Sequence, residues 1–373
     1  MITNVDNCVD IWQTARVTDG VSCMILRGGS SKGAYFLAHD LPSDALERDA
    51  LLLRIMGSPD ARQIDGIGGA HPLTSKVAVI APSADESADI DYLFLQVGVG
   101  EPVVSDRQNC GNLLAGVAPF AIERGLVAAP DNGEFSVRIK MLNTGSVATA
   151  RLHTAGGMPI YEGETAIASV PGTAAAIALE FEDIAGGSTG SLLPTGNTFD
   201  DIDGVCCTLV DNGMPVVVMA AEELGVTGYE SCEELEQNQQ LRAKLEAIRL
   251  DAGQRMNLGD VTSTTIPKLT MVAPPRDGGH LCTRTFIPHR CHDAIGVLGA
   301  VSVATAALLP GSPAHAMMGD LDGDVVQLEH PTGVFDAVIE IRQHAGGPIH
   351  VQRAGIIRTA RKLMDGTVFP RAN

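Results

Sequence analysis

Two segments of this chain predict helices that are apolar on nearly every face. "NCGNLLAGVAPFAIERGL" covers residues 109–126, and "HDAIGVLGAVSVATAALL" covers residues 292–309. A helix without a polar face cannot lie on a protein surface, so other parts of the chain must surround each segment. Both carry a glycine at the eighth position, Gly116 and Gly299. The pattern predicts two similar halves, each a curved sheet around one buried helix. A chance resemblance between two buried helices is the alternative.

The rest of the chain consists mainly of predicted strands. Short apolar runs such as "VSCMILRG", "KVAVIAP", "MPVVVMA" and "FDAVIEIR" are bounded by turn residues, which is typical of β-structure. The segments with helical character are residues 43–56, 111–124, 233–250, 292–309 and 355–364. Pro119 is expected to kink the second of them. Strands outnumber helices and do not alternate with them regularly, which predicts an α+β fold rather than a doubly wound one.

The length of 373 residues exceeds what one hydrophobic core usually supports, so two domains are expected. Residues 182–204 are rich in Gly, Ser, Thr and Asp, and the predicted division lies there. It gives an N-terminal domain of residues 1–187 and a C-terminal domain of residues 188–351. The basic, amphipathic residues 352–373 could cross back to the first domain.

The formal net charge of -19 argues against nucleic acid and anionic membranes as partners. An anionic substrate would have to be bound by local Lys, Arg and backbone N–H groups. The first residues show no signal-peptide pattern, and no apolar run reaches the ~18 residues of a membrane span. The eight cysteines include no Cys-x-x-Cys pair. We therefore expect a cytoplasmic protein with reduced thiols and no bound metal or cofactor.

"RGGSSKGAYF", residues 27–36, is a glycine-rich turn after a predicted strand. It is not a P-loop, because Gly-Lys-Ser/Thr is absent and a strand follows. One interpretation is a plain hairpin turn. The other is a carboxylate cradle made of N–H groups and the hydroxyls of Ser30 and Ser31, with charge from Arg27 or Lys32.

Lys76 and Cys110 are the candidates for acid–base chemistry. Lys76 stands at the start of the apolar run "KVAVI", where it is either a surface lysine or a partly buried base. Cys110 stands directly before an apolar helix, where the dipole and free N–H groups favour a thiolate. The N–H groups that follow it suit a carboxylate or a developing enolate. The alternative for Cys110 is packing alone.

The second apolar helix is preceded by "FIPHRCHDAIG", residues 286–296. His289 and His292 are three residues apart, but no third ligand is evident nearby, so no metal site is expected. Arg290, or Arg284 in the preceding strand, could face a substrate.

Together these motifs resemble the family of 2-methylaconitate isomerases and 4-oxalomesaconate tautomerases. The resemblance rests on "RGGSSKGAYF", "MGSPDARQIDGIGGAHPLTSKVAV", "QNCGNLLAGVAPFAIERGLV" and "FIPHRCHDAIGVLGAVSVATAALLPGSPA", and it covers most of the chain from about Cys23 onward. It implies the diaminopimelate epimerase fold, with two pseudo-symmetric domains that each wrap a β-sheet or barrel around a central helix. The active site would lie in the cleft between them.

The resemblance also implies that Lys76 and Cys110 form a proton-transfer pair, with the roles of base and acid open. Epimerases of this fold use two opposed cysteines. In the second half the position aligned with Cys110 is Asp293, which argues against two thiols, although Cys291 is close enough to keep that option open.

Stretches such as "DNGMPVV" resemble the oxalomesaconate tautomerase branch most. The expected activity is cofactor-independent interconversion of the keto and enol forms of 4-oxalomesaconate, a tricarboxylate from gallate-type aromatic breakdown. Two alternatives stay open: allylic isomerisation of 2-methylaconitate in propionate breakdown, and polycarboxylate binding without catalysis. The predicted substrate-binding residues are Arg27, Ser30, Ser31, Ser75, Asn109, Gly111, Asn112 and Arg284. The sequence does not determine the oligomeric state, and a homodimer is one option.

Overall fold

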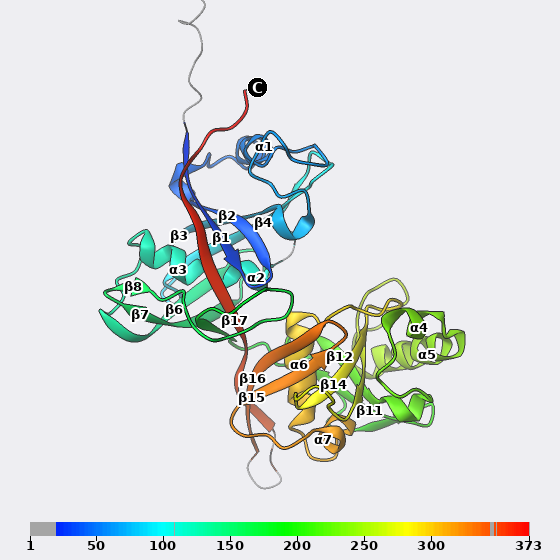
Figure 1. Ribbon diagram of the computed structural model, residues 1–373. Helices are drawn as coiled ribbons and strands as arrows, with labels where there is room; N and C mark the ends of the chain where they lie inside the picture. Colours follow the sequence, from blue (N-terminus) through cyan, green and yellow to red (C-terminus); the bar gives the residue numbers. More distant parts are fainter. Residues whose placement is uncertain (1–19, 108, 344–346, 348, 373) are drawn as a thin grey trace, which may run out of the picture.

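The computed structural model describes residues 20–107, 109–343, 347 and 349–372 (Figure 1). The first 19 residues of the predicted N-terminal domain lie outside the described residues. The strands are β1 (Val21–Gly28), β2 (Ser31–Leu37), β3 (Lys76–Pro82), β4 (Ile90–Val97), β5 (Val104–Ser105), β6 (Asn132–Met141), β7 (Val147–Ala155), β8 (Met158–Pro159), β9 (Ala176–Phe181), β10 (Asp200–Ile202), β11 (Val205–Asp211), β12 (Pro215–Ala220), β13 (Lys268–Ala273), β14 (Leu281–Phe286), β15 (Val325–His330), β16 (Gly333–Gln343) and β17 (Ile349–Val368). The helices are α1 (Ala45–Met56), α2 (Gly111–Leu114), α3 (Val117–Glu123), α4 (Cys232–Gln237), α5 (Gln239–Arg255), α6 (Val297–Ala307) and α7 (Pro313–Met317).

The first half is a closed barrel around a broken helix. Its strands pair in the order β1–β2–β3–β4–β6–β7–β9–β17, and β17 pairs with β1 to close the ring. The interior holds α2 and α3, which share one apolar cluster with inward-facing strand residues such as Tyr35, Phe94 and Ile139. A helix that is apolar on all sides is thereby buried on all sides, as its sequence requires.

The second half repeats the pairing pattern of the first. The pairs β11–β12, β12–β13, β13–β14, β14–β15, β15–β16 and β16–β17 are antiparallel, parallel, antiparallel, parallel, antiparallel and antiparallel. The pairs β1–β2, β2–β3, β3–β4, β4–β6, β6–β7 and β7–β9 have the same directions in the same order. Helix α6 lies between β14 and β15 in the chain, as α2 and α3 lie between β4 and β6. The predicted α+β fold with two pseudo-symmetric halves is confirmed, and chance resemblance is excluded.

One predicted helix is wrong, because residues 355–364 belong to strand β17. This strand pairs with β16 at its start, with β9 over Gly355–Thr359, and with β1 over its last part. Its middle is covered on both faces where the two halves meet, so its buried residues do not alternate. The sequence therefore lacks the alternation of polar and apolar residues that would predict a strand. Pairing with neighbouring strands on both edges of β17 outweighs the local preference for a helix. Figure 1 shows β17 running through both halves. The division at residues 187 and 188 stays a prediction.

The helix predicted over residues 111–124 is broken into α2 and α3 at Ala115 and Gly116. Pro119 has no N–H, so the carbonyl of Ala115 lacks the partner that a continuous helix would supply. The helix predicted over residues 292–309 begins only at Val297, and the five residues before it form a loop. No helix in the described part of the chain is long and apolar enough to span a membrane.

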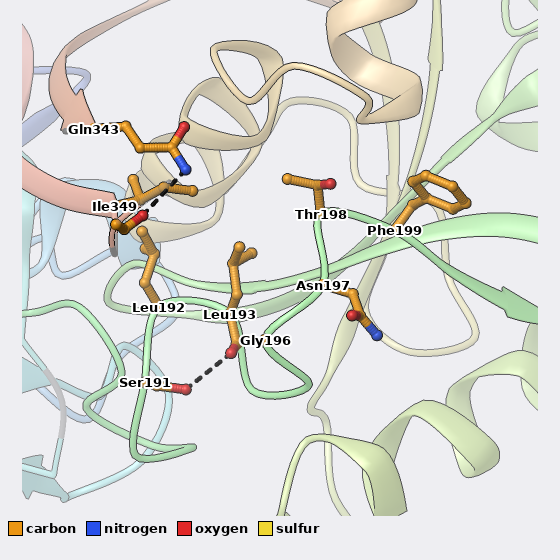
Figure 2. Close-up of a pocket in the computed structure, with 10 residues that line it drawn as sticks. Ser191, Leu192, Leu193, Gly196, Asn197, Thr198, Phe199, Gln343 and Ile349 are labelled. Carbon is orange, nitrogen blue, oxygen red and sulfur yellow. Dashed lines mark hydrogen bonds between the residues drawn. The ribbon is translucent and has the colours of Figure 1, made fainter. Parts of the chain in front are cut away.

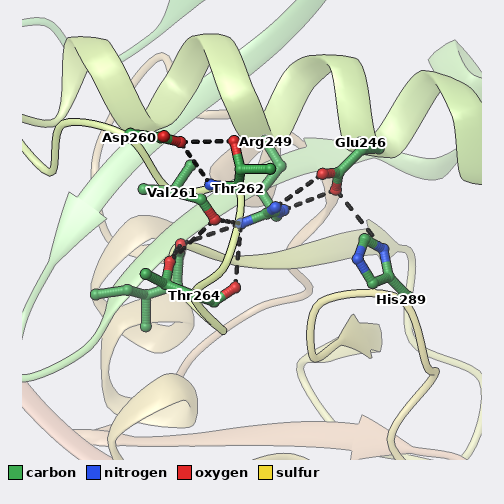
Figure 3. Close-up of polar contacts among 8 residues, drawn as sticks. Glu246, Arg249, Asp260, Val261, Thr262, Thr264 and His289 are labelled. Carbon is green, nitrogen blue, oxygen red and sulfur yellow. Dashed lines mark hydrogen bonds and ion pairs between the residues drawn. The ribbon is translucent and has the colours of Figure 1, made fainter.

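A buried arginine fixes α5 to the segment that leads into β13. Arg249 is fully buried, and its guanidinium forms an ion pair with Glu246 at 2.7 Å and donates to the carbonyl of Val261 at 2.9 Å (Figure 3). Glu246 also lies 3.7 Å from Nδ1 of His289. The charge of Arg249 is therefore fully partnered inside the second half.

Candidate active site

Lys76 begins β3, and its side chain points into the barrel. It lies on the same face of the strand as Ala78 and Ile80, which belong to the interior cluster. Lys76 is 7% exposed, and its Nζ donates to Oε1 of Gln96 at 2.9 Å and lies 4.9 Å from the centre of the Phe94 ring. Of the two sequence interpretations, the structure shows the buried lysine.

Cys110 directly precedes α2 and lies against the face of β4 that points into the barrel. It is 9% exposed and packs in the interior cluster, and its side chain does not cap the helix. The carbonyl of Cys110 accepts a hydrogen bond from the Tyr92 hydroxyl at 3.4 Å. Tyr92 precedes Phe94 by two residues, a spacing of about 7 Å along a strand. Lys76 and Cys110 therefore contact neighbouring side chains on one face of one strand.

Two glycines in the β1–β2 turn allow α2 to approach these strands. A Cβ on Gly28 would lie 2.5 Å from the carbonyl oxygen of Asn112 and 2.9 Å from the Tyr35 hydroxyl. Gly29 has a φ of +52°, and a Cβ there would lie 2.3 Å from Oδ1 of Asn112. Nδ2 of Asn112 donates to Oγ of Ser30 at 3.2 Å. The "RGGSS" turn is thus a hairpin against which the start of α2 packs closely.

A cavity of about 600 Å³ lies between the two halves, next to the contact between this hairpin and α2. It is lined by Ser30, Leu73, Asn112, Ile167, Ala168 and Ser169 from the first half, by His292, Asp293, Ala294, Ile295, Gly296, Val297, His330, Thr332, Val334 and Phe335 from the second, and by Arg358 of β17. A Cβ on Gly111 would lie 3.6 Å from a methyl carbon of Val297, so the starts of α2 and α6 face each other here. We call this space the junction cavity.

Two predicted substrate ligands in the first half are bonded within the protein instead. Nη1 of Arg27 donates to the carbonyl oxygens of Gly29 and Thr359 at 2.8 and 3.1 Å. Ser75 is fully buried, and its hydroxyl accepts a hydrogen bond from Gln63 at 2.7 Å. Neither residue lines the junction cavity, and neither do Lys76 and Cys110, so the predicted contacts of Arg27 and Ser75 with carboxylates stay a prediction.

Arg284, a third predicted substrate ligand, lies on the outward face of β14 and does not line the junction cavity. Its Nε donates to the carbonyl oxygen of Glu230 at 2.8 Å, and it shares this face with Cys282 and Phe286. Side chains alternate between the faces of a strand, and the sequence alone did not show which face is outward. The alternative, Arg290, is highly exposed and lies 3.7 Å from Glu236.

The remaining predicted ligands are divided between places. Ser30 and Asn112 line the junction cavity, and Ser31 is buried with no hydrogen-bond partner for its hydroxyl among the described residues. Asn109 and Gly111 line a separate cavity of about 500 Å³ that also reaches Val297. Nδ2 of Asn109 donates to Thr144 at 2.8 Å. These five remaining residues therefore lie around the start of α2, but they do not line one common cavity.

Arg358 is the cation of the junction cavity, and the sequence did not identify it. It is 8% exposed, its Nε donates to Oδ1 of Asn112 at 3.2 Å, and its guanidinium carbon lies 4.0 Å from the centre of the Phe335 ring. Burial lowers the pKa of Arg358 to about 10, which leaves it charged at neutral pH. The residue lies within the run that was predicted to be helical. An arginine among apolar residues in "GIIRTA" was its only sequence signal.

The two histidines of the junction cavity are uncharged at neutral pH. Burial lowers the pKa of His292, and burial together with the neighbouring imidazole of His292 and the charges of Arg284 and Arg358 lowers that of His330 to about 4. Nδ1 of His292 accepts a hydrogen bond from the backbone of Ala294 at 2.8 Å. Since His289 instead faces Glu246, the two histidines of the "PHRCH" segment do not converge.

Cys291 lies outside the junction cavity. It packs in the apolar cluster between the second-half sheet and α5, and burial raises its pKa, with a further contribution from neighbouring Cys232. Asp293, two residues later, lines the cavity. The placement of Cys291 therefore gives no support to a mechanism with two opposed thiols.

Two other cavities lack the chemistry of the junction cavity. One, of about 670 Å³, is lined by residues 191–193 and 196–199 together with Gln343, Gly347 and Ile349, and no lining side chain is charged (Figure 2). The other, of about 600 Å³, contains Arg151 and Arg353, and both form ion pairs with Glu180. Among these three spaces, only the junction cavity presents a cation without an ion-pair partner among the described residues.

Comparison with known proteins places the chain in a family. A family model described as "PrpF protein" matches residues 19–371. A (4E)-oxalomesaconate Delta-isomerase of Novosphingobium sp. (strain KA1) is 58% identical over 356 residues, which cover 95% of this chain and 98% of the relative. A 4-oxalomesaconate tautomerase of Pseudomonas putida is 55% identical over 350 residues, covering 93% and 95%.

A solved structure agrees with these sequence matches. The crystal structure of a methylitaconate-delta-isomerase is 34% identical, with a TM-score of 0.86 over 95% of this chain and 96% of that one. The match extends over both halves and the junction between them. The chain belongs to the PrpF protein family.

Proposed function

We propose that this chain is an isomerase that interconverts the keto and enol forms of 4-oxalomesaconate. The observation that carries the proposal is the placement of Lys76 and Cys110 against Phe94 and Tyr92 on one face of β4. An amine and a thiol that are both buried against neighbouring residues of one strand suit proton transfer. The names of the relatives that are 58% and 55% identical support oxalomesaconate as the substrate.

The reaction needs two proton transfers and no change of oxidation state. One member of the pair removes a proton from the carbon next to the ketone, and the electron pair of that C–H bond moves to the oxygen as an enolate. The other member donates a proton to the enolate oxygen. One proton leaves carbon and one reaches oxygen, so the formula of the substrate is unchanged. We propose Lys76 and Cys110 as this pair.

A second reaction on the same substrate is the shift of a carbon–carbon double bond. It begins with the same proton abstraction, but the proton returns to a remote carbon instead of the oxygen. The relative named as a Delta-isomerase favours this candidate. The 2-methylaconitate alternative has less support, because the relatives that are 58% and 55% identical are both named for oxalomesaconate. A binding protein without catalysis is disfavoured because these relatives are named as enzymes.

The test follows 4-oxalomesaconate in deuterium oxide by ultraviolet absorbance and proton NMR. The C110A and K76A variants are each expected to lose roughly 10²–10⁴-fold in kcat, which is the range for general acid–base groups. The controls are C206A and K244A, which remove a thiol and an amine from the second half, away from β3 and α2. Deuterium at the carbon next to the ketone indicates the tautomerase, and deuterium at a remote carbon indicates the double-bond shift. Wild-type rates in both C110A and K76A would refute the assignment.

We also infer a small tricarboxylate as the physiological ligand and the cytoplasm as the location. The seven described cysteines are all free, which fits a reducing compartment. A homodimer stays a prediction, which light scattering after size-exclusion chromatography would test.

A further inference from the structure

The buried arginines among the described residues differ in how their charge is balanced. Arg249 is paired with Glu246, and Arg284 donates to the carbonyl oxygens of Glu230 and Thr283 on the outward face of β14. Arg358 is 8% exposed and lines a cavity, yet no carboxylate of the described residues lies within ion-pair distance of it. Since buried charges in proteins are normally paired, a guanidinium that faces a cavity without a carboxylate indicates an anion from outside the chain.

The hydrogen bonds of Arg358 leave one end of its guanidinium available. Nε donates to Asn112 at 3.2 Å, and Nη1 donates to the carbonyl oxygen of Ile357 at 2.8 Å. Nη2 has no hydrogen-bond partner among the residues that the structure describes. The ring of Phe335 covers the guanidinium and fixes its plane. A planar group held in this way presents parallel N–H donors, which match the two oxygens of a carboxylate.

The surroundings favour an anion over other ligands. His292 and His330 are uncharged at neutral pH, so they offer polar atoms without charge. Asp336 affects Arg358 from beyond ion-pair distance, and Asp293 is an exposed residue at the cavity wall. The start of α6 also faces the cavity at Gly296 and Val297, with no side chain capping its N–H groups. Its dipole adds to the attraction.

Arg358 is linked to the proposed reacting groups by a short path. It bonds to Asn112, which comes two residues after Cys110 in the same helical turn, and Asn112 bonds to Ser30. An anion on Arg358 therefore lies beside the reacting centre and separate from it. The net charge of -19 means that such local attraction must overcome a repulsive field.

We propose that Arg358 binds a carboxylate of the substrate that does not react, and that Asn112 and Phe335 are positioning residues for its guanidinium. The assignment deepens the proposed function, because it names the group that selects a polycarboxylate. It replaces Arg27 and Arg284 as the source of charge.

The test uses tricarballylate (propane-1,2,3-tricarboxylate), a saturated tricarboxylate that cannot be turned over. Isothermal titration calorimetry of the whole chain at fixed ionic strength is expected to show binding that weakens roughly 10- to 100-fold in R358Q, the range for a charge-assisted contact. R358K restores charge without the planar fork and is expected to lie between the two. The matched control is R361Q, an exposed arginine three residues later on β17, which keeps wild-type affinity.

A second measurement separates ligand contact from a structural role. In the wild type, bound tricarballylate offsets the charge of Arg358, so the pKa of His330, followed by NMR, rises on binding. In R358Q the same ligand raises it less. For 4-oxalomesaconate, KM is expected to rise in R358Q more than kcat falls.

Three outcomes overturn the proposal: R358Q that binds tricarballylate like the wild type, a wild type that does not bind it, or R361Q that weakens as much as R358Q. Circular dichroism first establishes folding. If R358Q does not fold, R358K takes its place, and wild-type affinity in R358K then overturns the proposal. Absence of 4-oxalomesaconate turnover would defeat the proposed function alone, because binding of tricarballylate does not depend on the reaction.

Discussion

Substituting Gly28 with alanine tests whether the position of α2 controls activity. A Cβ at this residue would lie 2.5 Å from the carbonyl oxygen of Asn112 and 3.1 Å from the Cα of Leu113. An unstrained separation is about 3.5 Å, so the start of the helix must move by roughly 1 Å. Both contacts are to backbone atoms, which cannot rotate away as a flexible side chain does. The displaced segment begins directly after Cys110.

The displacement has an energetic and a catalytic consequence. Overpacking of this kind costs about 1–3 kcal/mol, and we expect Tm to fall by roughly 2–6 °C. A misplacement of about 1 Å at a reacting group can reduce kcat about 100-fold. Thermal melting by circular dichroism and initial rates with 4-oxalomesaconate measure the two effects. Gly100, around which a Cβ would meet no atom within 4 Å, provides the control G100A. If G28A retains both the kcat and the Tm of the wild type, the steric argument is wrong.

Three further predictions concern single side chains. The Y35F variant loses the bond from the Tyr35 hydroxyl to the carbonyl of Leu113, 2.6 Å in a buried site, so urea denaturation should show a loss of about 1–3 kcal/mol; an unchanged midpoint would contradict this. Burial, His292, Arg284 and Arg358 lower the pKa of His330 to about 4, while a backbone hydrogen bond with Asp293 acts in the opposite direction. The unfolded chain therefore binds more protons between pH 6.5 and 4, and stability falls as pH falls through that window. The H330Q variant should reduce this loss by about 2 kcal/mol, and equal pH slopes for both proteins would count against the argument. Burial raises the pKa of Cys23 to about 12, so iodoacetamide at pH 8 should label it only after unfolding, and rapid labelling of the native chain would show otherwise.

The sequence predicts those features that depend only on residue type and on the neighbouring residues in the chain. The two all-apolar helices required enclosure, and enclosure by two equivalent sheets is what the strand pairing shows. Pro119 predicted the interruption between α2 and α3 from its missing N–H alone. Lys76 and Cys110 were recognisable because a cation at the start of an apolar strand and a thiol before an apolar helix are both unusual.

The cavity cation was not predictable in the same way. Arg358 meets Asn112 across 246 positions of sequence, and its own segment lacks the alternation of a strand because both of its faces are covered. For Arg284 the sequence indicated a strand but not which face was outward, and a shift of one residue reverses that answer. A sequence shows which residue types are present. Which distant segments lie together depends on strand pairing, which is known only from the fold.

The 20-residue strand β17 has a consequence for how the chain acquires its structure. It is synthesised after every other strand that the structure describes, yet it closes the barrel against β1 and β9 and completes the second sheet against β16. Neither half can complete its sheet before β17 has been synthesised, and contacts between segments so far apart in the sequence make closure slow. Until then both halves have open strand edges, which are prone to aggregation. Because Arg358 lies on this strand, the cavity acquires its cation only when the barrel closes, so folding and binding competence are reached in one step.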